Sequence, residues 1–202
     1  MDVSTLHRMS TDELVRALEH GHPIDPRALD DTEYRGTSLG LPAFVERLTW
    51  KKFRKTFHRD PTTGALRGWN VRLEQNGREA PDVPRTKRAL LGAAAAVPPG
   101  AAGSTAAVPH TFGHYEVVSA TGYAMPTWKG RVVWAHRGLM IDYGRGANPP
   151  GLVRRVRDPL VAVNAGDSTL LLGWSYVDLG FARVGTPSFF TLELAGPLTH
   201  RA

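Results

Sequence analysis

From Trp50 onward, hydrophobic and polar residues alternate with a period of two, which is typical of β-strands. Residues 53–57 and 69–73 alternate in this way, and the turn-rich segment 60–64 between them predicts a β-hairpin. Runs of the same kind follow at residues 115–119, 132–136, 139–143, 160–163, 169–177 and 190–194. No helical pattern separates most of these runs, and parallel strands need crossover helices, so we expect the strands to be antiparallel.

The N-terminal region has a helical pattern instead. Ser10 and Glu13 form a capping box, which marks a helix start, and Gly21 marks its end. A second short helix is expected at Asp25, with Pro26 in its first position. These helices are too short to form a core of their own. The fold class predicted is therefore mainly β, an antiparallel up-and-down β-barrel of about 8–10 strands with a short N-terminal helical arm.

The domain organisation follows from where the pattern changes. Residues 1–48 are expected to form the arm, and residues 49–202 the barrel on which the arm packs. An Ala/Gly/Pro-rich tract interrupts the barrel at about residues 79–111 and predicts a loop, with room for a short helix over 86–96.

Composition excludes several kinds of chemistry. The chain has 202 residues, 42% of them hydrophobic, which suits a globular domain. It contains no cysteine, which rules out disulfides, a thiolate nucleophile and cysteine-ligated zinc. The start of the sequence lacks the pattern of a signal peptide, and no apolar stretch approaches the roughly 20 residues that span a bilayer. We therefore expect a cytoplasmic protein with no membrane span.

The net charge of +6 is concentrated in one segment. Residues 50–90 contain eleven Lys or Arg against four Asp or Glu. Such a segment could attract an anionic partner, but it contains no known nucleic-acid-binding module. A solvated basic face is the preferred interpretation, and nucleic acid is not expected as a partner.

Two motifs could suggest a catalytic or metal site. Residues 36–40, Gly-Thr-Ser-Leu-Gly, match the nucleophile elbow of hydrolases, which requires a buried strand before the serine and a helix after it. The residues before the motif have a loop-like composition, so a glycine-rich turn is the preferred interpretation. Two pairs of histidines, His20 with His22 and His110 with His114, lack further ligands in a recognisable pattern. No metal and no other cofactor is predicted.

A group of polar and aromatic residues within the predicted strands is the candidate site. Alternate residues of a small barrel point inward, so several of them could line one cavity. The ligand-binding candidates are Trp134, Trp174 and Tyr176 as apolar walls, with His136, Asp142, Tyr143 and Arg157 as orienting polar groups. For an enzyme, the catalytic candidates are His136, Asp142 and Glu116, as acid or base groups. The alternative for each residue is a place in the core or on the solvated surface.

Two stretches of the sequence resemble known small barrels. Residues 34–36, Tyr-Arg-Gly, with residues 50–53, Trp-Lys-Lys-Phe, resemble the opening of GXWXG-type and nitrobindin-like domains. Tyr34 stands where those domains have a tryptophan, and Glu33 stands near an expected glycine. The later strands are similar to the closing strands of lipocalin-like and fatty-acid-binding-like barrels. The resemblance implies a calycin-like up-and-down barrel around an apolar ligand, and it assigns no haem-ligating histidine.

Binding of a small apolar or amphipathic ligand inside the barrel is the preferred function. Two alternatives stay open. One is an enzyme of the cyclase, isomerase or lyase type that uses a His, Asp and Tyr group in the same cavity. The other is an interaction protein that binds an anionic partner through the basic 50–90 segment.

Overall fold

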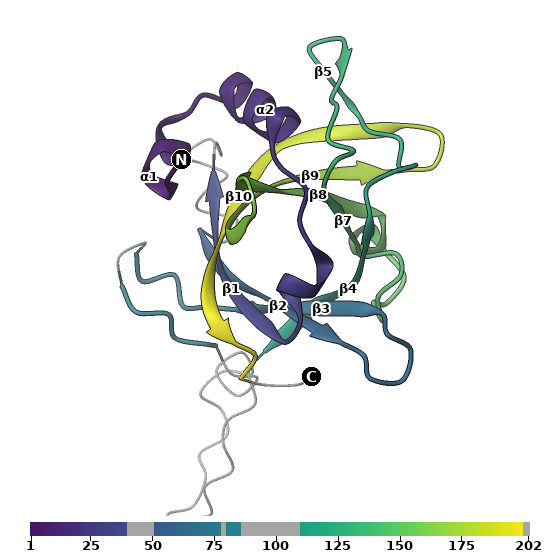
Figure 1. Ribbon diagram of the computed structural model, residues 1–202. Coiled ribbons are helices and arrows are strands. Elements are labelled where there is room, and N and C mark those ends of the chain that lie inside the picture. The colour runs from purple at the N-terminus through teal and green to yellow at the C-terminus, as the bar shows by residue number, and fades with distance from the viewer. Residues whose placement is uncertain (40–50, 78–79, 86–109, 200–202) are drawn as a thin grey trace, which may run out of the picture.

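The computed structural model describes residues 1–39, 51–77, 80–85 and 110–199. Within these ranges, eight antiparallel strands form one closed barrel in the order β1-β10-β9-β8-β7-β4-β3-β2 (Figure 1). The strands are β1 (Thr32–Leu39), β2 (Lys52–Arg59), β3 (Leu66–Arg72), β4 (Thr111–Ser119), β7 (Leu139–Asp142), β8 (Val156–Asn164), β9 (Asp167–Asp178) and β10 (Arg183–Pro197). Apart from the closing pair β1 and β10, neighbours in the barrel are also successive barrel strands in the chain. The predicted mainly β, up-and-down barrel is confirmed.

The helical arm is also present. It consists of α1 (Val3–Arg8), α2 (Thr11–His20) and the short 3-10 helix η1 (Pro26–Leu29). The predicted capping box starts α2: the Ser10 side chain accepts a hydrogen bond from the Glu13 amide, and the Glu13 carboxylate accepts one from the Ser10 amide. The chain after α2 is fixed to the barrel because His22 exchanges two backbone hydrogen bonds with Ala162 of β8.

The first predicted hairpin forms as expected. Strands β2 and β3 pair over their whole length, and the segment between them turns at Asp60, whose side chain accepts hydrogen bonds from the Thr62 and Thr63 amides. Gly64 completes the turn with a φ of +71°, a value that suits glycine. Here, the pattern and the turn chemistry point to the same structure.

Two expectations differ from the structure, and a third mostly concerns residues that the structure does not describe. Residues 32–39, expected in the arm, form the barrel strand β1, so the glycine-rich turn expected from residue 36 is strand up to Leu39. The run 132–136 is mostly not strand: only Arg131–Val132 (β6) pairs, with Thr127–Trp128 (β5), in a separate two-stranded sheet. Most of the expected loop 79–111, with the short helix over 86–96, lies outside the described residues.

Two groups of buried residues lie on opposite faces of the barrel wall. The inner core includes Phe57, Leu160 and Leu192, and at one end Ile24 and Leu29 from around η1 pack into it. In Figure 1 the purple segment that joins α2 to β1 crosses the barrel opening at this end. The outer core lies between the helices of the arm, residues 120–135 and the outer face of strands β8 to β10. Both faces of these strands are thus buried.

Candidate functional site

A partly open pocket of about 220 Å³ lies in the barrel and is the candidate site, which we call the interior cavity. Its apolar surface comes from Phe53, Phe112 and Phe190, and serines from three strands add small polar groups. Its lining consists of Ser38, Phe53, Lys55, Asn70, Phe112, Tyr143, Asp158, Ser175, Ser188 and Phe190. An apolar space with a few convergent polar groups is the usual form of a small-molecule site.

Four of the lining residues, Lys55, Asn70, Tyr143 and Asp158, form a hydrogen-bonded group that we call the inner cluster. The Lys55 ammonium donates to Asn70 Oδ1 at 3.1 Å, to the Tyr143 hydroxyl at 2.6 Å and to Asp158 Oδ2 at 3.3 Å. The Tyr143 hydroxyl in turn donates to Asp158 Oδ2 at 3.2 Å. All four residues are buried, so the chain holds an ion pair in its interior.

Aromatic rings surround the lysine. The Lys55 nitrogen lies 4.9 Å from the ring centre of Tyr115, 5.1 Å from that of Tyr143 and 5.3 Å from that of Phe190. Ring faces attract a cation, which adds to the attraction of Asp158. Burial nevertheless lowers the pKa of Lys55, and the carboxylate of Asp158 opposes this effect. Burial also raises the pKa of Tyr143 well above its ordinary value, and the charge of Asp158 adds to this shift.

A glycine allows Asn70 and Tyr143 to come together. Gly113 of β4 has a φ of +57°, and a Cβ atom there would lie 2.7 Å from Asn70 Nδ2 and 3.1 Å from Tyr143 Cε1. Its carbonyl accepts a hydrogen bond from Asn70 Nδ2 at 3.2 Å, and the same amide donates to the Tyr143 hydroxyl at 3.3 Å. Asn70 therefore uses its oxygen and both of its N–H groups, and it is fixed in one orientation.

One atom of the inner cluster is left without a partner. Asp158 Oδ2 accepts from Lys55 and Tyr143, whereas Oδ1 is buried and has no hydrogen-bond partner among the described residues. A buried carboxylate oxygen without a donor is unfavourable. Asp158 is also one of the residues that line the cavity.

Of the predicted ligand-binding residues, Tyr143 borders this cavity. Trp174 and Tyr176 belong to the outer core: Trp174 stacks on Phe189 and donates from Nε1 to the Thr186 carbonyl, and Tyr176 donates to the Ala124 carbonyl. These two are buried as expected, but on the other face of the wall. Neither residue lines the interior cavity. A role for them in binding a ligand elsewhere stays a prediction.

Trp134 and His136 lie outside the barrel wall, next to β6. Trp134 is 63% exposed, and its ring lies against that of His136 at 4.5 Å between centres. The His136 ring faces the Ala120 carbonyl at 3.4 Å, and in the part of the chain that the structure describes it forms no hydrogen bond with Asp142. The predicted pairing of these two residues as acid and base is therefore not present in this structure.

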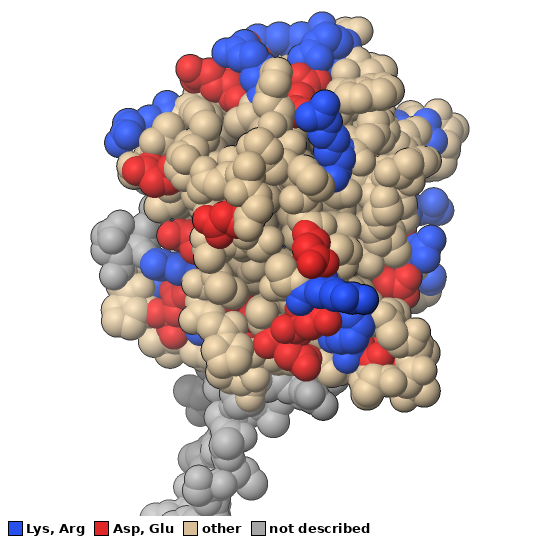
Figure 2. All heavy atoms as spheres, viewed as in Figure 1, with Lys and Arg blue, Asp and Glu red and all other residues tan. Residues whose placement is uncertain are grey.

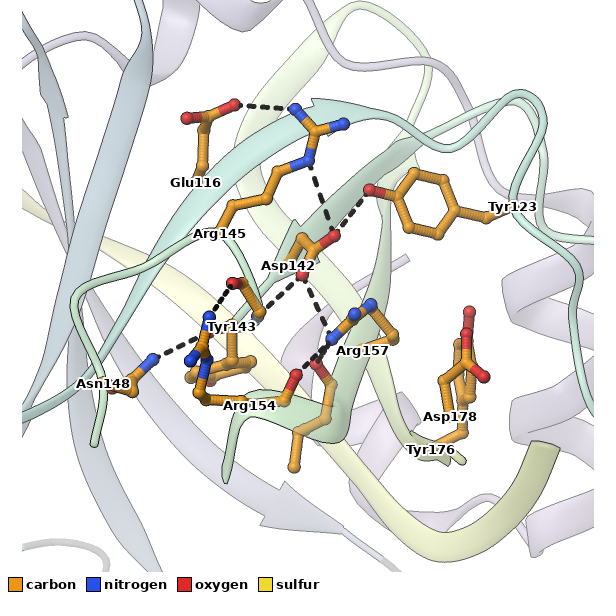
Figure 3. A network of polar contacts seen from close by, with 12 residues as sticks. Glu116, Tyr123, Asp142, Tyr143, Arg145, Asn148, Arg154, Arg157, Tyr176 and Asp178 are labelled. Atoms are coloured by element: carbon orange, nitrogen blue, oxygen red, sulfur yellow. Dashed lines mark hydrogen bonds and ion pairs between the residues drawn. The ribbon is translucent and has the colours of Figure 1, made fainter. Parts of the chain in front are cut away.

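Asp142 and Arg157, with the catalytic candidate Glu116, lie side by side on the outer face. The strand register pairs Glu116 with Asp142, and Asp142 with Arg157. Figure 3 shows this outer network, which we define as Glu116, Tyr123, Asp142, Arg145 and Arg157. Arg157 lies 3.1 Å from Asp142 Oδ1, and the Tyr123 hydroxyl donates to Oδ2 at 2.7 Å. Sequence reasoning thus found residues that are neighbours, on the face opposite the cavity.

A groove lies next to the interior cavity. It has a volume of about 610 Å³ and shares Asn70, Phe112 and Tyr143 with the cavity. Its other lining includes Pro149 and Val153, which belong to the segment between β7 and β8. The shared residues place the groove directly beside the inner cluster.

The basic segment is largely occupied by internal contacts. Of its described residues, Lys52 and Lys55 are buried, and Arg54, Arg59 and Arg67 form ion pairs with Glu33, Asp30 and Asp60. On the face shown in Figure 2, Lys and Arg side chains alternate with Asp and Glu side chains. The described part of this segment is therefore not a continuous positive surface.

The described ranges were compared with two further kinds of feature, a cluster of metal-ligating side chains and a membrane-spanning helix. No three His, Asp or Glu side chains there lie close enough together to hold a metal ion. None of the helices described combines the length and the apolar character needed to cross a membrane.

Comparison with known proteins gave no match to a family model, to a curated protein or to a solved structure. The geometry of the chain is thus the basis for any functional proposal.

Sequence reasoning missed three of the four residues of the inner cluster. Lys55 gave a signal, because it shares a strand face with Phe53 and Phe57. A lysine between two aromatic residues on one face of a strand indicates a buried cation. Asn70 and Asp158 gave no comparable signal, since their partners are distant in the sequence.

Proposed function

We propose that this protein binds a small amphipathic molecule inside the barrel. The apolar part of the molecule would lie against Phe53, Phe112 and Phe190, and its polar part near the inner cluster. The single observation that supports this function best is the interior cavity of about 220 Å³, in which aromatic rings and buried polar groups meet.

The size of the cavity limits the ligand. An engineered protein cavity of about 150 Å³ accommodates benzene. A cavity of about 220 Å³ therefore suits one six-membered ring with a small substituent. Longer lipid-like chains would need to extend into the neighbouring groove beside Phe112.

Two glycines make room for the rings that line the cavity. Gly36 pairs with Phe53 across β1 and β2, and Gly173 pairs with Phe190 across β9 and β10. A Cβ atom at either glycine would lie 2.2 Å from the facing ring. Both rings therefore lie flat over a glycine, which supports a fixed shape of the apolar wall.

A variant that fills the cavity tests this function. We expect toluene and cyclohexanol to shift the amide resonances of residues around the cavity in the wild-type protein, and Ser175→Leu to abolish these shifts. Ser119→Leu, at an exposed position of β4, is the matched control and should bind as the wild type does. Equal binding by wild type and Ser175→Leu, or no binding of either probe to the wild type, would contradict the proposal.

A further inference from the structure

The hydrogen bonds of the inner cluster are complete at every position but one. Lys55 directs its three N–H groups to Asn70, Tyr143 and Asp158. Tyr143 donates to Asp158 and accepts from Lys55 and Asn70. The exception is Asp158 Oδ1, which is buried and accepts from none of the described residues. The cluster can thus accept one more hydrogen bond, at a defined atom.

The charge of the cluster is balanced. Lys55 and Asp158 form an ion pair at 3.3 Å, and both side chains are 2% exposed. In such a low-dielectric place, a further charge without a counter-charge is strongly disfavoured. A cationic ligand would add a second positive charge beside Lys55, and an anionic ligand would lie beside Asp158. A neutral donor satisfies Oδ1 without either cost.

We propose that the ligand of this cavity is a neutral alcohol or phenol of about one ring, whose hydroxyl donates a hydrogen bond to Asp158 Oδ1. This inference rests on the proposed function and specifies the chemistry of its ligand. A hydroxyl group supplies the donor, and its own oxygen can accept from a serine of the lining. The ring occupies the space between Phe53, Phe112 and Phe190.

A pair of ligands of the same size tests the inference on the wild-type protein. Cyclohexanol can donate a hydrogen bond, whereas cyclohexanone can only accept one. We expect cyclohexanol to bind at least about tenfold more tightly in an NMR titration, because an unsatisfied buried acceptor is costly. Cyclohexylammonium should bind more weakly than cyclohexanol. Equal affinity of alcohol and ketone, or tighter binding of the ammonium compound, would overturn the inference.

Asp158→Asn gives a second, independent test. Lys55 and Tyr143 both donate to Oδ2, so the amide oxygen of the variant would take that place and its NH2 group the place of Oδ1. The variant would then present a donor to the cavity. We expect its preference for cyclohexanol over cyclohexanone to fall to about threefold or less. Asp142→Asn, on the outer face, is the matched control and should keep the full preference.

Failure of this inference is distinguishable from failure of the proposed function. If toluene binds to the wild type and not to Ser175→Leu, the cavity is a binding site. If cyclohexanol then shows no advantage over cyclohexanone, the inference is wrong and the proposed function stands. A wild-type protein that binds none of the probes contradicts both. Because the ligand pair is measured on the wild type, the test does not depend on the folding of Asp158→Asn.

Discussion

Two aspartates on neighbouring strands are both almost completely buried, yet their surroundings differ. Asp142 of β7 belongs to the outer network, and both of its oxygens have partners: Arg157 and the Gly144 amide on Oδ1, Tyr123 and Arg145 on Oδ2. Asp158 of β8 belongs to the inner cluster and has partners on Oδ2 alone. The two residues have nearly the same exposure, so burial alone does not distinguish the carboxylate with partners on both oxygens from the one with partners on a single oxygen.

The outer network and the inner cluster differ in their access to solvent and in the number of cations they contain. The outer network reaches solvent through Arg145, whose side chain is 53% exposed. Its arginines can adjust, and water can supply missing hydrogen bonds. The inner cluster has a single cation, Lys55, held between aromatic rings. These rings restrict how far the lysine can move, and among the described residues Asp158 Oδ1 has no donor.

The largest effect is expected when the inner ion pair is broken. Lys55→Met leaves the Asp158 carboxylate buried without its cation, which costs about 3–5 kcal/mol in comparable cases. The free energy of unfolding from urea titration, followed by circular dichroism, measures this loss. The double variant with Asp158→Leu removes both charges and should recover most of it. A cost below about 1 kcal/mol for Lys55→Met would show that the pair is not a stability determinant.

Effects of intermediate size on the free energy of unfolding are expected for two tyrosines. Tyr143 donates to Asp158 in the inner cluster, and Tyr123 donates to Asp142 in the outer network. Tyr143→Phe deprives buried Lys55 and Asn70 of an acceptor, so we expect a loss of about 2 kcal/mol in the free energy of unfolding. For Tyr123→Phe we expect about 1 kcal/mol, because Asp142 keeps its other donors. Equal losses would contradict the difference between the two regions.

The cost of Tyr143→Phe is also expected to depend on pH. An unfolded tyrosine ionises near pH 10, whereas burial and the charge of Asp158 hold the pKa of Tyr143 well above that value. Above about pH 10 the unfolded wild type therefore binds fewer protons than the folded protein, and its stability falls as pH rises. Tyr143→Phe lacks this titration. Its cost should be constant from pH 7 to about 9 and shrink from about pH 10 to 11, as urea titrations at each pH would measure.

Most of the barrel strands were predictable, but the direction of their faces was not. Alternation shows that Leu170, Leu172, Trp174 and Tyr176 share a face, as they do. The rule that the more apolar face points inward fails here, because the arm and residues 120–135 bury the outer face as well. The inner face of the same strand carries Gly173 and Ser175, which leave room for the Phe190 ring and the cavity.

The candidate site was also predictable only in part. Glu116, Asp142 and Arg157 were each candidates for a site inside the barrel, and the strand register makes them neighbours on its outer face. Asp158 is next in sequence to Arg157, so a single step along the strand separates the outer network from the inner cluster. Strand β1, which was missed, has a glycine, a serine and two threonines among its eight residues and lacks a continuous apolar alternation.

The smallest effect is expected for Arg145, at the solvent edge of the outer network. Arg145→Ala removes contacts to Glu116 at 3.1 Å and Asp142 at 3.6 Å. Because the arginine side chain itself is half exposed, we expect a cost of about 0.5 kcal/mol or less. Salt screens exposed charges but hardly reaches buried ones. The cost of Arg145→Ala should therefore shrink in 1 M NaCl, while the cost of Lys55→Met stays the same. If both costs fell alike, the two networks would share one electrostatic environment, and the distinction between them would be lost.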